Sequence, residues 1–142
     1  METSFLPVLA CGVLSMVIGS IWYGPMFGKK WMGICKVNPE DVAARKKMQK
    51  EAAPLYLVQF LITLFQAFVL YRYMVSINSW GGFESNISHS LIIVFAFVIP
   101  TVAGSSMWNN DTSDVKWSRF LIQSGYQVVQ FVMFALVFSF LA

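Results

Sequence analysis

Long apolar segments alternate with short polar ones along the chain, and this pattern predicts four membrane-spanning helices. The apolar segments cover residues 5–23, 55–74, 88–107 and 120–141. About 20 helical residues, at 1.5 Å each, cross a hydrocarbon core of about 30 Å. Strict period-two alternation is absent, and backbone groups in lipid must pair internally, so helices are expected rather than a barrel. The predicted fold is all-α, an integral membrane four-helix bundle forming a single domain over residues 1–142.

Composition agrees with this fold class. Of the 142 residues, 57% are hydrophobic and 12% are charged, whereas a typical soluble domain has about 45–50% apolar and about 25% charged residues. A soluble domain of this size cannot bury so much apolar surface, because its ratio of surface to volume is too high. Soluble globular enzymes, disordered chains and disulfide scaffolds are therefore excluded.

Basic residues are unevenly distributed between the loops. Nine of the ten lie between the first and second or between the third and fourth spans, and only Arg72 borders the remaining loop. Since cytoplasmic loops carry the excess of Lys and Arg, both basic loops are expected in the cytoplasm. This predicts a multi-pass protein of the cytoplasmic (inner) cell membrane, with the N- and C-termini and residues 76–87 outside. The net charge of +3 then gives no indication of nucleic-acid binding.

The longer basic loop is predicted to contain a short cytoplasmic helix over residues 39–52. Asn38 stands at the N-cap position and Pro39 in the first turn, where both residue types are favoured. Pro54 is expected to mark a break or the first turn of the second span. The basic cluster is a candidate contact for anionic lipid; it comprises Arg45, Lys46, Lys47 and Lys50.

The sequence carries no motif for catalysis, a metal ion or a cofactor. Cys11 in the first span and Cys35 in the first loop are separated by the membrane, so no disulfide is expected. Neither cysteine has a metal-type partner, and the only histidine in the sequence is His89, at the outer start of the third span. A Ser–His–Asp set, an HExxH motif and a glycine-rich phosphate loop are all absent. A non-enzymatic protein without a cofactor is expected.

Two polar features lie close to the membrane ends. Asn86-Ile87-Ser88 matches the N-glycosylation pattern but abuts the third span. Asp111 and Asp114 lie in the loop between the third and fourth spans, where a polar turn is expected because too few ligands accompany them for a cation site.

Polar side chains inside the second and fourth spans recur at positions i, i+4 and i+7, which lie on one face of a helix. The candidate residues are Gln59, Thr63, Gln66, Gln123, Tyr126, Gln127 and Gln130. Two interpretations are open: hydrogen bonding between packed helices, or a polar cavity for a solute. No span contains a carboxylate, which argues against an ion-coupled antiporter.

The first and third spans also carry small or polar faces. These comprise Gly12, Ser15 and Gly19 in the first span, and Thr101, Ser105 and Trp108 in the third. Small residues allow helices to approach closely. Pro100 lacks an amide hydrogen for the carbonyl of Ala96 and is expected to kink the third span.

The densest pattern follows the first span and reads Trp22-Tyr23-Gly24-Pro25-Met26-Phe27-Gly28-Lys29-Lys30-Trp31. Gly24 and Pro25 are expected to end the helix. The aromatic residues are typical of a belt at the membrane interface, with the lysines reaching the headgroups. The alternative is an ordered elbow that folds back to line a site.

Residues 22–31 resemble the signature of a family of small, mostly bacterial four-span membrane proteins that is defined only as a domain of unknown function. Members typically carry a tryptophan-tyrosine-glycine-proline elbow followed by phenylalanine, glycine, lysine and tryptophan. Gln66-Ala67-Phe68-Val69-Leu70 resembles the family's second-helix segment. Gln123-Ser124-Gly125-Tyr126 resembles the fourth, where asparagine is commoner than Gln123. The resemblance covers nearly the whole chain and implies the same four-span topology, with no assigned activity or ligand.

Small multidrug transporters also have four short spans, but they rely on a glutamate in the first span, which this sequence lacks. Two hypotheses for function remain. The first is a non-enzymatic bundle that acts through helix–helix interaction, as a homo-oligomer or as an accessory subunit of a membrane protein partner. The second is a small transporter or channel for a neutral or weakly polar solute.

Overall fold

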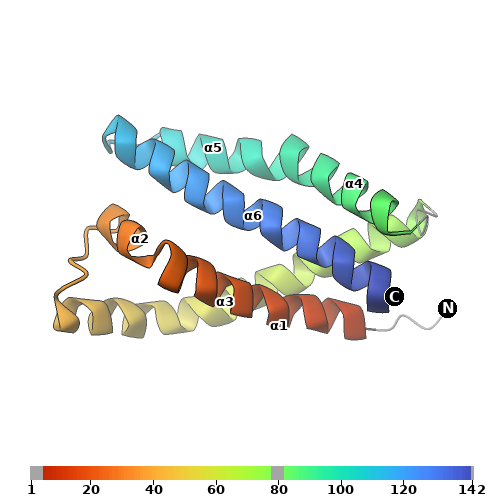
Figure 1. The fold of residues 1–142 in the computed structure, drawn as a ribbon, viewed down its shortest axis with the longest axis horizontal. Helices are drawn as coiled ribbons and strands as arrows, with labels where there is room; N and C mark the ends of the chain where they lie inside the picture. Colours follow the sequence, from red (N-terminus) through yellow and green to blue (C-terminus); the bar gives the residue numbers. More distant parts are fainter. Residues whose placement is uncertain (1–4, 78–81, 142) are drawn as a thin grey trace.

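The computed structural model describes residues 5–77 and 82–141, and these form helices joined by short turns (Figure 1). The elements are α1 (Leu6–Ile21), η1 (Trp22–Met26), α2 (Gly28–Ile34), α3 (Val42–Ser76), α4 (Phe83–Ile93), η2 (Val94–Val98), α5 (Ile99–Met107) and α6 (Ser113–Leu141), where η marks a π-helical segment. Part of the predicted outer loop, residues 78–81, lies outside the described residues.

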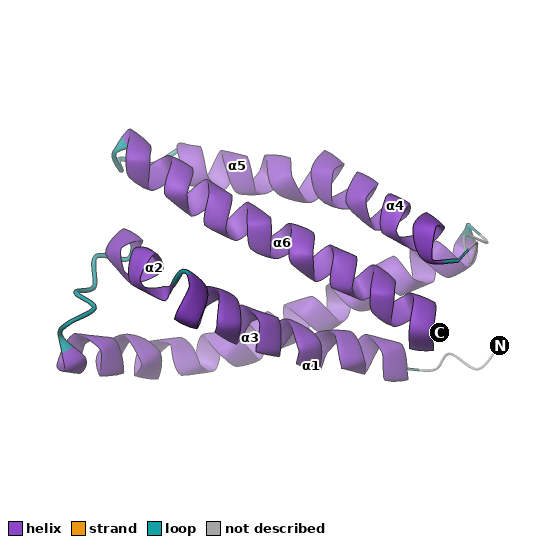
Figure 2. Ribbon diagram, viewed as in Figure 1, coloured by secondary structure: helices purple, strands orange, loops and turns teal. Residues whose placement is uncertain are grey.

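Four helical stretches are long and apolar enough to cross a membrane, which confirms the predicted all-α, four-helix fold class. They are Leu6–Met26, Val42–Ser76, Phe83–Met107 and Ser113–Leu141. Figure 2 shows helix throughout the bundle, interrupted by short loops. We call the end of the bundle that contains η1, α2 and the turn between α5 and α6 the elbow end, and the opposite end the far end.

Helix α6 lies in the middle of the bundle, with α4 and α5 along one side and α1 along another (Figure 1). Its far half supplies the aromatic core. The Phe134 ring lies 5.5 Å from that of Phe131 and 6.4 Å from that of Phe138, measured between centroids. Because lipid is as apolar as these side chains, close packing rather than escape from water stabilises the contact.

The other helices cover much less of α3 than of α6. Helix α3 packs mainly against α1, and its buried side chains form one stripe of Thr63, Ala67, Leu70 and Met74. Each of the side chains of residues 55–58 is more than half exposed. Successive residues point about 100° apart around a helix. Four successive side chains therefore point to all sides of the helix. Since all four are exposed, no other part of the described chain covers this turn of α3.

The predicted cytoplasmic helix over residues 39–52 is not a separate element. Helix α3 begins at Val42 and continues through Pro54 into the span, and its N-cap is Asp41 rather than Asn38. Asp41 Oδ1 accepts a hydrogen bond from the backbone amide of Ala44, three residues later, at 3.1 Å. Pro54 and the residue four positions earlier are exposed, where water can bond to the carbonyl that Pro54 leaves unpaired. The short helix of this loop is α2.

Each π-helical segment contains a proline or ends shortly before one. The expectation that Gly24 and Pro25 end the helix is wrong, because η1 continues to Met26. The amide of Phe27 donates to the carbonyl of Trp22, five residues earlier, at 3.0 Å. A wider turn accommodates the proline ring and its missing amide hydrogen. The segment η2 ends two residues before Pro100, so the irregularity expected in the third span takes the form of a π turn.

Candidate functional site

The elbow is anchored to α6 through Trp22. Its indole Nε1 donates to the carbonyl oxygen of Ile122 at 2.9 Å. The same ring lies over Gly125, where an added Cβ would be 2.8 Å from ring atom Cζ2. Only glycine permits this approach without moving the ring. The ring of Phe27 also packs against the Trp22 ring, with 4.9 Å between centroids.

The second aromatic residue of the elbow, Tyr23, joins α2 to α6. Its ring centroid lies 4.9 Å from that of Trp31 and 5.6 Å from that of Tyr126. Lys29 and Lys30 are exposed, as expected for lysines that reach the headgroups. The elbow is therefore an ordered segment that folds back onto the fourth span.

Helix α1 uses its face of small residues to contact both α3 and α6. The hydroxyl of Tyr126 donates to the carbonyl oxygen of Ser15 at 3.1 Å, and a Cβ added at Gly19 would lie 3.3 Å from that hydroxyl oxygen. A Cβ added at Gly12 would lie 2.6 Å from Cδ2 of Leu64 in α3. The small residues thus permit close helix approach on both sides.

Two candidate glutamines of α6 bond to different neighbouring helices. Gln130 Nε2 donates to Gln66 Oε1 of α3 at 3.2 Å, which links the two predicted glutamine faces directly. Two turns nearer the elbow end, Gln123 Oε1 accepts a hydrogen bond from Ser106 Oγ of α5 at 3.3 Å. The structure therefore brings Gln66 and Gln130 together and turns Gln123 toward the third span.

The remaining candidates make no interhelical bond within the described chain. Gln59 Nε2 donates to Thr63 Oγ1 of the same helix at 3.3 Å. Oε1 of Gln127 is buried and has no hydrogen-bond partner among residues 5–77 and 82–141. Gln127 is itself half-buried.

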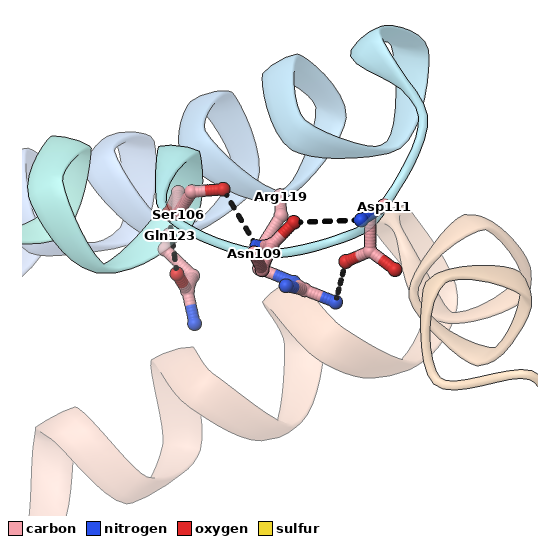
Figure 3. A network of polar contacts seen from close by, with 5 residues as sticks. All are labelled: Ser106, Asn109, Asp111, Arg119 and Gln123. Atoms are coloured by element: carbon pink, nitrogen blue, oxygen red, sulfur yellow. Dashed lines mark hydrogen bonds and ion pairs between the residues drawn. The ribbon is translucent and has the colours of Figure 1, made fainter.

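A network of polar contacts orders the turn between α5 and α6 (Figure 3). Arg119 Nη2 pairs with Asp111 Oδ2 at 2.9 Å, and the amide of Asp111 donates to Asn109 Oδ1 at 3.0 Å. Asn109 Nδ2 in turn donates to the carbonyl oxygen of Ser106 at 2.9 Å. The polar turn predicted around Asp111 is confirmed. From the sequence, Arg119 was identified only as a basic residue that indicates orientation. In the structure its guanidinium pairs with the carboxylate of Asp111.

The predicted polar face of the third span points away from the bundle. Thr101 and Ser105 are exposed, and each hydroxyl donates to a carbonyl of its own helix, at 2.7 and 3.0 Å. Trp108 is 90% exposed. Backbone carbonyls satisfy these hydroxyls, so they can face lipid at little cost. The hydroxyl that faces α6 belongs to Ser106, one residue further along.

The glycosylation pattern at Asn86 is occupied by a structural contact. The side chain is 1% exposed, and its Nδ2 donates to Ser139 Oγ of α6 at 3.0 Å. In the folded protein this amide is a buried contact between α4 and α6. Sequence reasoning assigned no partner to Asn86.

Metal-type ligands do not gather within the described part of the chain, where no three His, Cys, Asp or Glu side chains come together. Cys11 is buried, Cys35 is exposed, and both are free thiols. Burial raises the pKa of Cys35, and the nearby Arg119 guanidinium partly offsets that rise. The groups described at the site are therefore amides, hydroxyls, aromatic rings and the Arg119–Asp111 ion pair.

Comparison with known proteins places the chain in one family. A family model described as "Protein of unknown function (DUF1761)" matches residues 6–139, which include the elbow and all four candidate spans. No curated protein and no solved structure matches the chain. The match agrees with the resemblance to a family of unknown function, and the chain belongs to the DUF1761 family.

Proposed function

We propose that the protein is a non-enzymatic, multi-pass protein of the cytoplasmic membrane that acts through helix–helix association, as a homo-oligomer or as an accessory subunit. The elbow-end half of α3 is the proposed association surface. In this proposal the elbow end faces the cytoplasm and both termini face outward, as the distribution of basic residues favours.

The bare turn of α3 is the observation that carries this proposal. Leu55 and Leu57, on opposite sides of the helix, are 64% and 63% exposed, and Phe65 further along is 69% exposed. Lipid alone could cover apolar side chains, but half-buried Gln59 lies one turn beyond Leu55. An amide at this depth is costly in lipid, and a neighbouring helix lets it bond across an interface.

Cross-linking of single cysteines tests this surface. In a background of Cys11→Ala and Cys35→Ser, Leu55→Cys places a thiol on the Gln59 side of α3, and Phe97→Cys places one on η2 as the control, because Phe97 is 70% exposed. We expect a cross-linked dimer, or a cross-link to another protein, at position 55 and none at position 97. Equal cross-linking at the two positions, or none at either, would contradict the proposal.

A second candidate function is a small transporter or channel for a neutral or weakly polar solute. Buried oxygens without partners in the described chain favour it, and two of them belong to Gln127 and Gln130. Solute flux into proteoliposomes tests it by comparing the wild type with Gln127→Leu and with Gln49→Leu, an exposed control. Transport predicts flux that only Gln127→Leu lowers, and background flux in all three would reject it for the solutes tried.

The basic cluster at residues 45–50 is proposed to contact anionic lipid. It lies on the exposed first turns of α3, and each basic residue near an anionic surface contributes about 1 kcal/mol. Lys47 Nζ lies 3.9 Å from Glu51 Oε1. Because both side chains are well exposed, this ion pair leaves Lys47 accessible to lipid headgroups.

A further inference from the structure

We infer that the hollow at the turn between α5 and α6 binds the phosphate group of an anionic phospholipid. The hollow has a volume of about 690 Å³ and is lined by Met107, Trp108, Asn109, Asn110 and Lys116. Pockets that bind small ligands have volumes of about 300–1,000 Å³. The site lies on other helices than the proposed association surface and the basic cluster of α3, so the inference depends on neither of them.

The turn that forms one side of the hollow is held in place by its own contacts. The side chain of Asn109 bonds at both ends: Nδ2 donates to the carbonyl oxygen of Ser106 at 2.9 Å, and Oδ1 accepts from the amide of Asp111 at 3.0 Å. The carboxylate of Asp111 pairs with Arg119 of α6 at 2.9 Å (Figure 3). These contacts tie the turn to both neighbouring helices, and a site that is ordered in advance binds its ligand at a lower entropic cost.

Three of the lining side chains carry hydrogen-bond donors that no described protein group uses. They are the indole Nε1 of Trp108, the amide of Asn110 and the ammonium of Lys116, which make no hydrogen bond or ion pair with residues 5–77 and 82–141. Indole and ammonium groups can only donate. A ligand that fits this hollow must therefore offer several acceptor atoms, as the oxygens of a phosphate group do.

The hollow also carries a positive charge without a counter-charge. Lys116 is half-buried, and among the described residues no carboxylate lines the hollow. Of the two carboxylates nearest along the chain, Asp111 is paired with Arg119. The other, Asp114, lies two positions before Lys116, and helix residues two apart do not face each other. Since lysine is a common ligand for phosphate, an anionic phosphate group balances this charge.

The position of the hollow indicates that the phosphate belongs to a lipid. The third candidate span ends at Met107, so the hollow begins where the hydrocarbon core gives way to the headgroups. Trp108 is 90% exposed, and exposed tryptophan is typical of the headgroup level. The outward face of α5 that carries Thr101, Ser105 and Trp108 leads to the hollow. Acyl chains that lie along this face bring a headgroup to Lys116.

Photo-cross-linking in lipid nanodiscs tests the site. Two probes carry a diazirine beside the phosphate: phosphatidylglycerol, which is anionic, and phosphatidylcholine, whose phosphate is balanced by its own ammonium. Peptide mapping measures the ratio of the two labels on residues 107–116, because a change in exposure alone affects both probes alike. The wild type should favour phosphatidylglycerol. Lys116→Gln should lower the ratio about fivefold, the contribution of one basic residue near an anionic surface.

Two matched variants and one competitor make the result specific. Lys116→Arg keeps the charge and should keep the ratio, whereas Lys36→Gln removes a charge from an exposed residue outside the hollow and should leave the ratio unchanged. Equal labelling by the two probes, an unchanged ratio in Lys116→Gln, or an equal fall in Lys36→Gln would overturn the inference. Excess inorganic phosphate at constant ionic strength should not reduce the label. Loss of the label would assign the hollow to a soluble phosphate compound and overturn the assignment to lipid.

Discussion

Helices α6 and α3 are both long and apolar enough to cross a membrane, yet they have opposite surroundings. Half of the span window of α6 is buried, against 17% for α3, although α6 has the lower mean hydropathy, 1.6 against 1.8. The third span has the highest value, 2.0, and only 11% of its window is buried. In lipid, apolar side chains can face outward, so hydropathy does not determine which helix is buried. Small and polar residues, which favour contacts between helices, determine which helix lies at the centre. The following predictions test that difference.

The largest effect is expected from truncating core phenylalanine. Phe134→Ala on α6 removes a fully buried ring and should destabilise the protein by about 3 kcal/mol, mostly through the cavity that it leaves. Phe65→Ala on α3, 69% exposed, should change stability by less than about 0.5 kcal/mol. Denaturation in mixed detergent micelles measures both. Equal losses would show that α3 is packed as tightly as α6.

A smaller loss is expected where the elbow touches α6. Gly125→Ala forces a methyl group against the Trp22 ring, which its hydrogen bond holds in place, and should cost about 1–3 kcal/mol. Gly104→Ala on α5 is the matched control, because a Cβ there meets nothing within 4 Å, and it should be neutral or stabilising. The same denaturation measurement applies. A neutral Gly125→Ala would mean that the elbow is not anchored through Trp22.

The direct bond between α3 and α6 should contribute less. A double-mutant cycle with Gln66→Leu and Gln130→Leu should give a coupling energy of about 0.6 kcal/mol, and at most about 1.7. The pair Gln59→Leu and Gln130→Leu serves as the control, since Gln59 bonds within α3, and should show no coupling. Equal coupling energies in the two cycles would show that Gln130 does not interact with Gln66 more strongly than with Gln59.

The smallest expected effect concerns the reactivity of Cys35, which follows the last residue of α2. Its raised pKa reduces the thiolate fraction at neutral pH, so maleimide should react more slowly with Cys35 than with a cysteine whose pKa is unshifted. Arg119→Gln removes the charge that lowers this pKa. The pKa should then rise further, and the pH profile of labelling should move to higher pH.

Labelling rates measured against pH, with Lys116→Gln as the control, check this prediction. An unchanged profile in Arg119→Gln would contradict it. A maleimide that cannot cross the membrane also tests the orientation of the protein. If Cys35 is cytoplasmic, it should be labelled only after the cells are permeabilised.

Periodicity and composition predicted the spans but not their ends. Four apolar stretches are enough to identify four helices, because lipid demands internal hydrogen bonding. The end of the first helix was misplaced because a π turn accommodates Pro25. The start of α3 was misplaced because Asn38 and Asp41 are both good caps, and only the folded chain shows which of them is used.

The candidate site could be predicted only in part. The faces that carry Gln66 and Gln130 were identified by their spacing, and these two residues do meet. In the third span the same reasoning selected Ser105, whereas Ser106 contacts α6. One residue is a rotation of about 100°, and helix rotation depends on packing against neighbours. Sequence spacing therefore identifies a face without telling which helix it meets.

The mass of the intact particle in native lipid tests the central claim, association through α3, most directly. Native mass spectrometry of nanodiscs extracted without detergent would count the subunits. The proposal predicts two or more copies, or one copy with a copurifying membrane protein. A single 16.0 kDa chain with lipid alone would contradict it.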